Sequence, residues 1–273
     1  MVETSWLLTS LTSNIVTRVR IPPCPPHYMK QNISIGKVLA SSFQFLGNNF
    51  NVRLKEGFPA VLLITIAFNI LNYLITKDVA SNFTILFFFL FTMLISSAIG
   101  ICVHEEILNK NKILFFREFL SYRSLKYFLN FLLLTVLAIS PIVTHLIIRK
   151  MSGGSSEHAS GLLGLLWIFT MVLALKLIFI LPKLTLGLNF KYNFKELNFI
   201  GSKLFILLVI VTVIFLFPSM IFLTLQLSFM TSYKDLYEVI KPLFDIGSFY
   251  ISYLNYITIF AVISYAFKEY FSK

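Results

Sequence analysis

Charged residues are scarce in this chain of 273 residues, where Asp, Glu, Lys and Arg together make up 13%, against roughly 25% in a soluble domain. Hydrophobic residues make up 57%, and the mean hydropathy is +0.82. A soluble globule of this composition would have too few polar side chains to cover its surface. The scarcity of charge therefore excludes a soluble protein and indicates a membrane protein.

Cysteine is scarcer still, since the chain has only Cys24 and Cys102. The topology deduced below places both on the cytoplasmic side, where thiols stay reduced. Two such residues give no disulfide framework. The fold is therefore expected to depend on packing and hydrogen bonds.

Catalytic signatures are also missing. His104-Glu105-Glu106 begins like the zinc-protease motif H-E-x-x-H, but Leu108 stands where the second His is required. No serine lies in a nucleophile elbow, and no glycine-rich stretch has the spacing of a phosphate-binding loop. We therefore predict a protein that is not an enzyme and has no metal or cofactor, and we interpret residues 104–106 as a charged cap at the membrane interface.

Long apolar runs, in contrast, are abundant. A helix needs about 20 mainly apolar residues to cross a hydrocarbon core of roughly 30 Å. Six runs in this chain are long enough and contain few charges. They are Phe58 to Thr76, Phe83 to Val103, Tyr127 to Ile148, Leu162 to Leu181, Leu204 to Phe222 and Ile246 to Phe267.

These runs predict an all-α fold, a polytopic transmembrane helix bundle with six spans. No gap between runs is longer than about 23 residues, the length of residues 223–245, which is too few for a separate soluble domain. Residues 29–273 are therefore predicted to form a single transmembrane domain.

The positive charge of the chain is sorted by side. Its net charge of +11 would suggest nucleic-acid binding in a soluble protein. Here fifteen Lys and Arg residues fall in segments on the side of the amino terminus, and five fall on the opposite side. The positive-inside rule places both termini in the cytoplasm of a bacterial cell with the spans in its inner membrane. Membrane lipids are the expected partners, and no nucleic acid is expected.

The first 28 residues differ from the rest of the chain. They contain four of the nine prolines and lack apolar periodicity, and they have none of the parts of a secretory signal. The run Val19 to Pro22 can be encoded by bases that match part of a transfer RNA gene. We therefore expect translation to begin at Met29, the alternative being a disordered cytoplasmic tail.

Amphipathic segments precede three of the spans. Before the first span, apolar residues from Ile35 to Phe50 recur every three or four positions, which predicts a helix. It either lies in the headgroup plane or packs on the bundle. Similar basic and aromatic stretches, Ile113 to Lys126 and Phe190 to Lys203, precede the third and fifth spans. The chain is thus read as three copies of an interfacial amphipathic helix followed by a transmembrane hairpin.

Polar side chains are rare inside the predicted spans, so each is a candidate for function. Thr65, Asn69, Asn72 and Thr76 are spaced by four, three and four residues, which places them on one face of the first span. This face either forms hydrogen bonds between helices or lines a solute path. Lys176 is the one ionisable residue well inside a span. Its stem either reaches towards the inner interface, or its ammonium group pairs with a buried carboxylate.

Two further features concern helix geometry. Pro141, Pro182 and Pro218 lie in or at the ends of the third, fourth and fifth spans, where each can kink its helix. On the outer side, residues 232–245 mix charged and apolar side chains, which is typical of a short amphipathic surface helix.

The segment before the first span also resembles a known group of proteins. The resemblance rests on Ile35, Gly36, Lys37, Val38, Leu39, Ser42, Phe43, Leu46, Asn49 and Phe50, with Leu181 and Pro182 later in the chain. These residues resemble uncharacterised six-helix bacterial inner-membrane proteins, which are similar to the membrane domain fused to some glycerophosphodiester phosphodiesterases. The resemblance implies a six-helix fold. It implies no phosphodiesterase activity, because the catalytic barrel is absent from this sequence.

Taken together, these features predict an envelope accessory or scaffold protein. The alternative is a transporter of a small solute or lipid, with its path near Asn69, Asn72, Lys176 and the proline kinks. An intramembrane enzyme is the third reading. The sequence names no substrate or protein partner for any of them.

Overall fold

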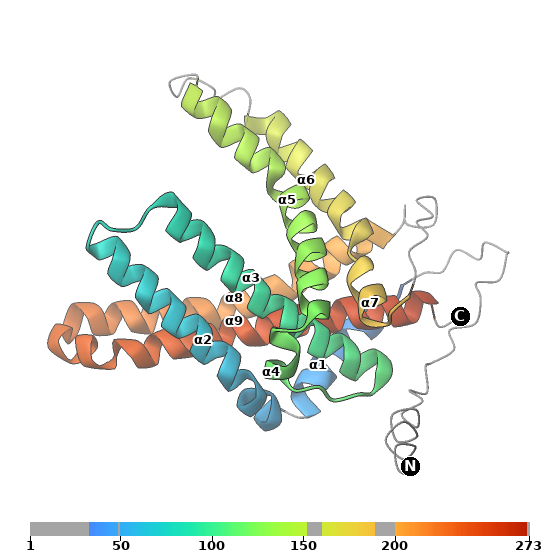
Figure 1. Ribbon diagram of the computed structural model, residues 1–273, viewed down its shortest axis with the longest axis horizontal. Helices are drawn as coiled ribbons and strands as arrows, with labels where there is room; N and C mark the ends of the chain where they lie inside the picture. The colour runs from blue at the N-terminus through green and yellow to red at the C-terminus, as the bar shows by residue number, and fades with distance from the viewer. Residues whose placement is uncertain (1–32, 49, 152–159, 189–199, 272–273) are drawn as a thin grey trace, which may run out of the picture.

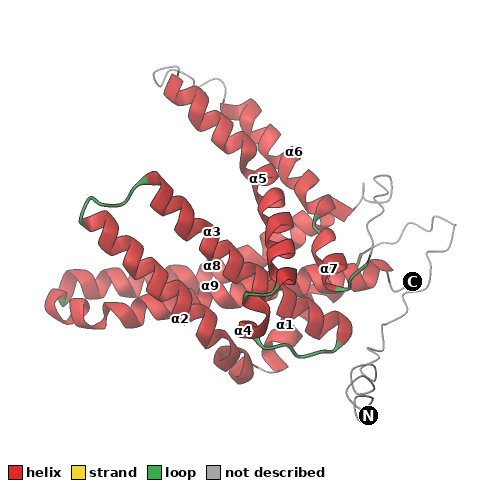
Figure 2. Ribbon diagram, in the orientation of Figure 1, coloured by secondary structure: helices red, strands yellow, loops and turns green. Residues whose placement is uncertain are grey.

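The computed structural model describes residues 33–48, 50–151, 160–188 and 200–271. These residues fold into helices joined by short turns, and this part of the chain contains no strand (Figure 2). The predicted all-α transmembrane class is confirmed. The predictions for residues 1–28, and for most of the segment from Phe190 to Lys203, lie outside the described residues.

Six helices are long and apolar enough to cross a membrane, as predicted. They form three consecutive hairpins (Figure 1). The helices are α2 (Phe50–Thr76), α3 (Asn82–His104), α5 (Tyr122–Met151), α6 (Ser160–Leu177), α8 (Ile200–Ser232) and α9 (Lys234–Phe271).

Several helices extend well beyond the apolar runs. Helix α2 begins at Phe50 instead of Phe58, because Arg53 and Glu56 in its first turns form ion pairs. Helix α9 begins at Lys234, so residues 234–245 continue directly into the last span. The separate surface helix expected over residues 232–245 is therefore not formed.

The hairpins meet at one end and diverge at the other (Figure 1). We call the end where they meet the base and the opposite ends the tips. Within the most apolar windows, 44% of the residues of α3 and 39% of those of α9 are buried, against 17% for α5 and α8. Helices α3 and α9 are therefore central, whereas α5 and α8 present most of their surface outward.

Four short elements complete the base: α1 (Ile35–Asn48), the π-helix η1 (Glu105–Asn109), α4 (Phe115–Phe119) and α7 (Ile180–Thr185). The predicted amphipathic helix before the first span is α1, whose stripe of Val38, Ser42 and Leu46 is buried and which packs mainly on α9. Its apolar face thus meets the bundle, the second of the two predicted arrangements. The predicted segment before the third span is reduced to α4, followed directly by α5.

Pro182, in the first turn of α7, accounts for the break between α6 and α7 at residues 178–179. A proline ring has no N–H to donate and collides with the carbonyl four residues earlier. Around Ile178 the chain accordingly tightens into short-range bonds, with Leu181 N–H donating to the Ile178 carbonyl at 3.0 Å. Pro141 and Pro218 lie within α5 and α8, which continue past them.

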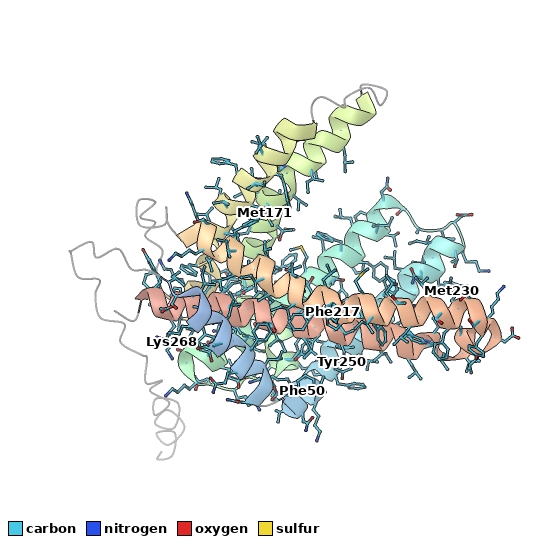
Figure 3. All side chains as sticks on the ribbon, turned by 180° about the vertical axis from the view of Figure 1, so that it is seen from behind. Phe50, Met171, Phe217, Met230, Tyr250 and Lys268 are labelled. Carbon is cyan, nitrogen blue, oxygen red and sulfur yellow. The ribbon has the colours of Figure 1, made fainter. Side chains whose placement is uncertain are left out.

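Large apolar side chains cover the outside of the spans (Figure 3). On α8, Phe217 is 73% exposed and Met230 is 45% exposed, and on α3 the Phe83 side chain is 77% exposed. Exposed apolar surface of this extent is unfavourable in water and favourable in hydrocarbon. The surface is therefore that of a multi-pass membrane protein.

Candidate functional site

Three consecutive residues at the end of α3 reach three different helices. His104, Glu105 and Glu106 are the last residue of α3 and the first two residues of η1. Successive side chains on a helix point in different directions, about 100° apart at 3.6 residues per turn. His104 contacts α5 and α9, Glu105 contacts α5, and Glu106 contacts α2. We call these three residues and their partners the basal junction.

His104 is fully buried and bonded at both ring nitrogens. Its Nδ1 lies 2.6 Å from the Ser264 hydroxyl and its Nε2 lies 2.9 Å from the Tyr127 hydroxyl. Ser264 donates its own hydrogen to the Phe260 carbonyl at 2.8 Å, so it accepts from His104 Nδ1–H. A neutral ring then accepts from Tyr127 at Nε2. The imidazole thus joins α3 to α5 and α9.

Glu105 joins the first hairpin to the second. Its carboxylate, which is buried, forms an ion pair with Arg123 of α5 and accepts a hydrogen bond of 2.7 Å from Asn109. Arg123 also donates to the Thr185 carbonyl of α7 at 2.5 Å. One arginine therefore ties η1 and α7 to α5.

Glu106 binds Arg53 of α2 in a bidentate ion pair, with distances of 2.6 and 2.5 Å. Arg53 is only 5% exposed, and its guanidinium lies 4.3 Å from the centre of the Phe45 ring of α1. Glu56 accepts from Arg53 at 3.2 Å and pairs with Lys112 at 2.6 Å. Charge pairing and a cation–π contact therefore hold this arginine at the base.

Sequence reasoning missed the junction and took residues 104–106 for an interfacial cap. Whether these residues lie at the membrane interface stays a prediction, but His104, which is 0% exposed, and Glu105, which is 5% exposed, are buried among other helices. The partners are distant in the chain, since Ser264 is 160 residues from His104. One available signal was the arginine near the start of each of two spans, because arginine suits bidentate pairing with a carboxylate better than lysine does.

The predicted polar stripe on α2 runs from a buried to an exposed position. Thr65 is buried, Asn69 and Asn72 are partly buried, and Thr76 is exposed. Thr65, Asn69 and Thr76 donate to the carbonyls of Val61, Thr65 and Tyr73, at 2.8, 2.9 and 2.8 Å. All three acceptors belong to α2 itself.

Lys176, the other predicted candidate, lies in the last turn of α6, in a different hairpin from the stripe on α2. Its stem packs on α8, where a Cβ added at Gly201 would lie 2.7 Å from Lys176 Cγ and 2.7 Å from the Val172 carbonyl oxygen. Gly201 therefore permits the close approach of α6 and α8. The structure does not bring Lys176 and the stripe together.

A pocket of about 490 Å³ lies beside the basal junction, between α2, α3, α9 and the segment containing α4. We call it the basal pocket. Its walls combine apolar side chains with the charged groups of the junction and its surroundings. The residues that line it are Arg53, Lys55, Glu56, Pro59, Ile99, Cys102, Val103, Glu106, Lys112, Ile113, Leu114, Phe115, Phe116, Arg117, Tyr253 and Ile257.

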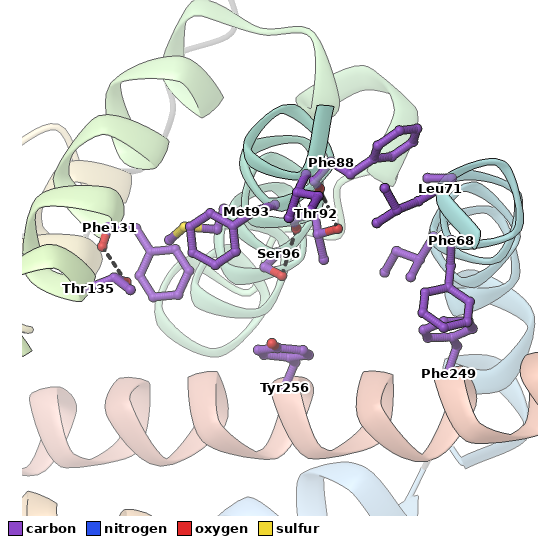
Figure 4. Close-up of a pocket in the computed structure, with 14 residues that line it drawn as sticks. Phe68, Leu71, Phe88, Thr92, Met93, Ser96, Phe131, Thr135, Phe249 and Tyr256 are labelled. Carbon is purple, nitrogen blue, oxygen red and sulfur yellow. Dashed lines mark hydrogen bonds between the residues drawn. The ribbon is translucent and has the colours of Figure 1, made fainter. Parts of the chain in front are cut away.

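A second pocket, of about 450 Å³, lies nearer the tips between α2, α3, α5 and α9 (Figure 4). We call it the upper pocket. Phe68 and Phe249 face each other on one side of it, and Tyr256 projects from α9 towards α3. The hydroxyls of Thr92, Ser96 and Thr135 donate to carbonyls of their own helices at 2.9, 3.0 and 2.9 Å, so these groups are already engaged. The pocket is therefore suited to an apolar ligand.

The two pockets follow each other along the same helices. On α3, Ser96 lines the upper pocket and Ile99 the basal one, and on α9 the neighbours Tyr256 and Ile257 are divided in the same way. Three residues of a helix correspond to a rise of about 4.5 Å. The pockets are thus consecutive compartments along the seam between α2, α3 and α9. None of the five predicted candidates lines either of them.

The charged side chains at the base can form ion pairs and bind an ion of opposite charge. Within the described ranges, no three His, Cys, Asp or Glu side chains are grouped as metal ligands.

No protein-family model matches the chain, and no curated protein and no solved structure is significantly similar to it.

Proposed function

We propose that this protein is a non-catalytic accessory or scaffold protein of a bacterial inner membrane, with both termini in the cytoplasm. The observation that supports this role is the basal junction, where His104, Glu105 and Glu106 are each bonded to another helix. Buried polar groups whose hydrogen bonds are satisfied by other helices fix the positions of those helices relative to one another. The outward faces of α5 and α8 remain available to lipid or to other membrane proteins.

The proposed orientation is supported by charge at the base. Lys55, Lys112 and Arg117 all lie there, around the basal pocket. Basic residues next to membrane spans favour the cytoplasmic side. The tips, including the turn at Lys77, would then face away from the cytoplasm.

Cysteine accessibility tests both the sealed interior and the orientation. In a chain without Cys24 and Cys102, Asn69→Cys and Lys176→Cys are exposed to a membrane-impermeant thiol reagent from each side. We expect both to be protected. Lys77→Cys and Asn111→Cys, at exposed positions of a tip and the base, are matched controls expected to react from opposite sides. Labelling of Asn69→Cys and Lys176→Cys would contradict a sealed scaffold, and labelling of Asn111→Cys from outside would contradict the orientation.

The second candidate function is movement of a lipid along the seam between α2, α3 and α9, and the consecutive pockets favour it. One pocket has charged walls and the other is apolar, as a path for an amphiphile requires. To test this function, the purified protein is reconstituted into vesicles that contain a fluorescent phospholipid, and a membrane-impermeant quencher is added outside. If the protein moves lipid between the leaflets, fluorescent lipid from the inner leaflet will also be quenched. Quenching limited to the outer leaflet, as in protein-free vesicles, would reject this function and leave the scaffold.

A further inference from the structure

We propose that the basal pocket binds the headgroup of an anionic phospholipid, such as phosphatidylglycerol, from the leaflet at the base. This site does not depend on whether the protein acts as a scaffold or moves lipid. It is inferred from the charge balance of the pocket and from its apolar walls.

The pocket has an excess of positive charge. Four cations line it, Arg53, Lys55, Lys112 and Arg117, against the two carboxylates of Glu56 and Glu106. Glu106 is held by Arg53, and Glu56 by Arg53 and Lys112. These pairs use both carboxylates and leave two positive charges in excess.

Lys55 and Arg117 carry this excess. Both side chains are exposed, and neither forms an ion pair with any residue in the described ranges. Lys55 is on α2 and Arg117 on α4, two separate elements that both contribute to the pocket wall. A phosphate group between them would gain two charge-assisted contacts.

The apolar walls favour a lipid over a free anion. Pro59, Ile99 and Ile257 line the pocket from α2, α3 and α9. Leu114 and Phe116, next to the cationic groups, are 76% and 62% exposed, and such side chains are more favourably placed against hydrocarbon or the headgroup boundary than in water. A ligand here meets cations at one end and apolar groups at the other. Its acyl chains can continue along the seam towards the upper pocket.

The test compares lipid binding by the purified full chain in detergent, using native mass spectrometry. Phosphatidylglycerol and phosphatidylcholine with identical acyl chains are the probes. Lys55→Gln with Arg117→Gln removes the excess charge, and Lys37→Gln with Lys126→Gln removes the same charge from exposed positions near the base that do not line the pocket. All four positions are exposed, and equal melting temperatures will verify that the variants are folded.

We expect the unmodified protein to prefer phosphatidylglycerol, the pocket variant to bind it about tenfold more weakly, and the control variant to change less than twofold. An equal loss in both variants would indicate general surface attraction and overturn the site. The absence of a preference for phosphatidylglycerol would overturn it too. Displacement of the lipid by millimolar inorganic phosphate would assign the pocket to a free anion instead. The assay needs no assumption about orientation or role, so its failure is separate from failure of the proposed function.

Discussion

Tyr127 donates its hydroxyl hydrogen to Nε2 of His104 across 2.9 Å, and both side chains are buried where α3, α5 and α9 meet. The same hydroxyl faces Gly100 one turn earlier on α3, where an added Cβ would lie 2.6 Å away. The tyrosine ring thus fills a space that exists only because position 100 has no side chain. Packing and hydrogen bonding depend on each other at this point.

Tyr127→Phe tests the hydrogen bond to His104. The substitution keeps the ring and leaves a buried acceptor without its donor, which should lower the free energy of unfolding by about 1–3 kcal/mol. The measurement is denaturant unfolding in detergent. Tyr73→Phe, at a residue of α2 that is 62% exposed, is the control and should change stability by less than about 0.5 kcal/mol. His104→Leu combined with Tyr127→Phe should cost less than the sum of the single changes. Strict additivity would argue against a direct bond.

Glu106→Gln tests the pairing of Arg53. Arg53 is only 5% exposed, so in this variant its positive charge stays buried without the negative charge of its bidentate partner. We expect the free energy of unfolding to fall by about 3 kcal/mol. The same substitution at Glu238, an exposed residue near the start of α9, is the matched control and should have little effect. Thermal unfolding of the two variants side by side would decide the matter. Equal melting temperatures would show that the ion pair contributes nothing.

Gly57→Ala tests the contact between α2 and α9. A Cβ at position 57 would collide with the ring of Tyr253, which is buried, so we expect a loss of about 2 kcal/mol from overpacking. Gly164→Ala, within α6, meets no atom within 4 Å and should be neutral or slightly stabilising. Unfolding curves that show the same change for both alanines would contradict the close packing at Gly57.

Tyr237→Phe tests the tip of the third hairpin. Gln226 of α8 donates to the Tyr237 hydroxyl at 2.9 Å, joining the two helices close to their connection. Without this bond, amide hydrogen exchange should accelerate near the tip, while exchange at the base stays unchanged. Tyr233→Phe is the neighbouring control, because Tyr233 is 60% exposed. Faster exchange throughout the chain would show that the tip and the base are not independent.

The sequence predicts the helices well because the signal for a span is local. A run of about 20 apolar residues is sufficient, whatever surrounds it. The helix ends are predicted less well, since Arg53 and Glu56 look like loop residues until the ion pairs formed at Glu106 and Lys112 are known.

The basal junction could not be predicted in this way. Its contacts join residues as far apart as His104 and Ser264, and no periodic pattern records such a pairing. The stripe at Thr65 and Asn69 is a true helical face, but helix periodicity cannot say that these side chains bond to carbonyls of their own helix. Whether this face or Lys176 borders a solute path remains a prediction for the labelling experiment, and the likeness to six-helix inner-membrane proteins remains a prediction as well.

The placement of the polar contacts gives the molecule a mechanical asymmetry. The bonds from His104 to Tyr127 and Ser264, and from Glu105 to Arg123, join different hairpins, and all lie at the base. Towards the tips the hairpins diverge, and their apolar sides face outward (Figure 1). The three hairpins are thus tied to one another at the base. We expect a change in the thickness or lateral pressure of the leaflet at the tips to alter the angles between the hairpins while the bonds at the base persist.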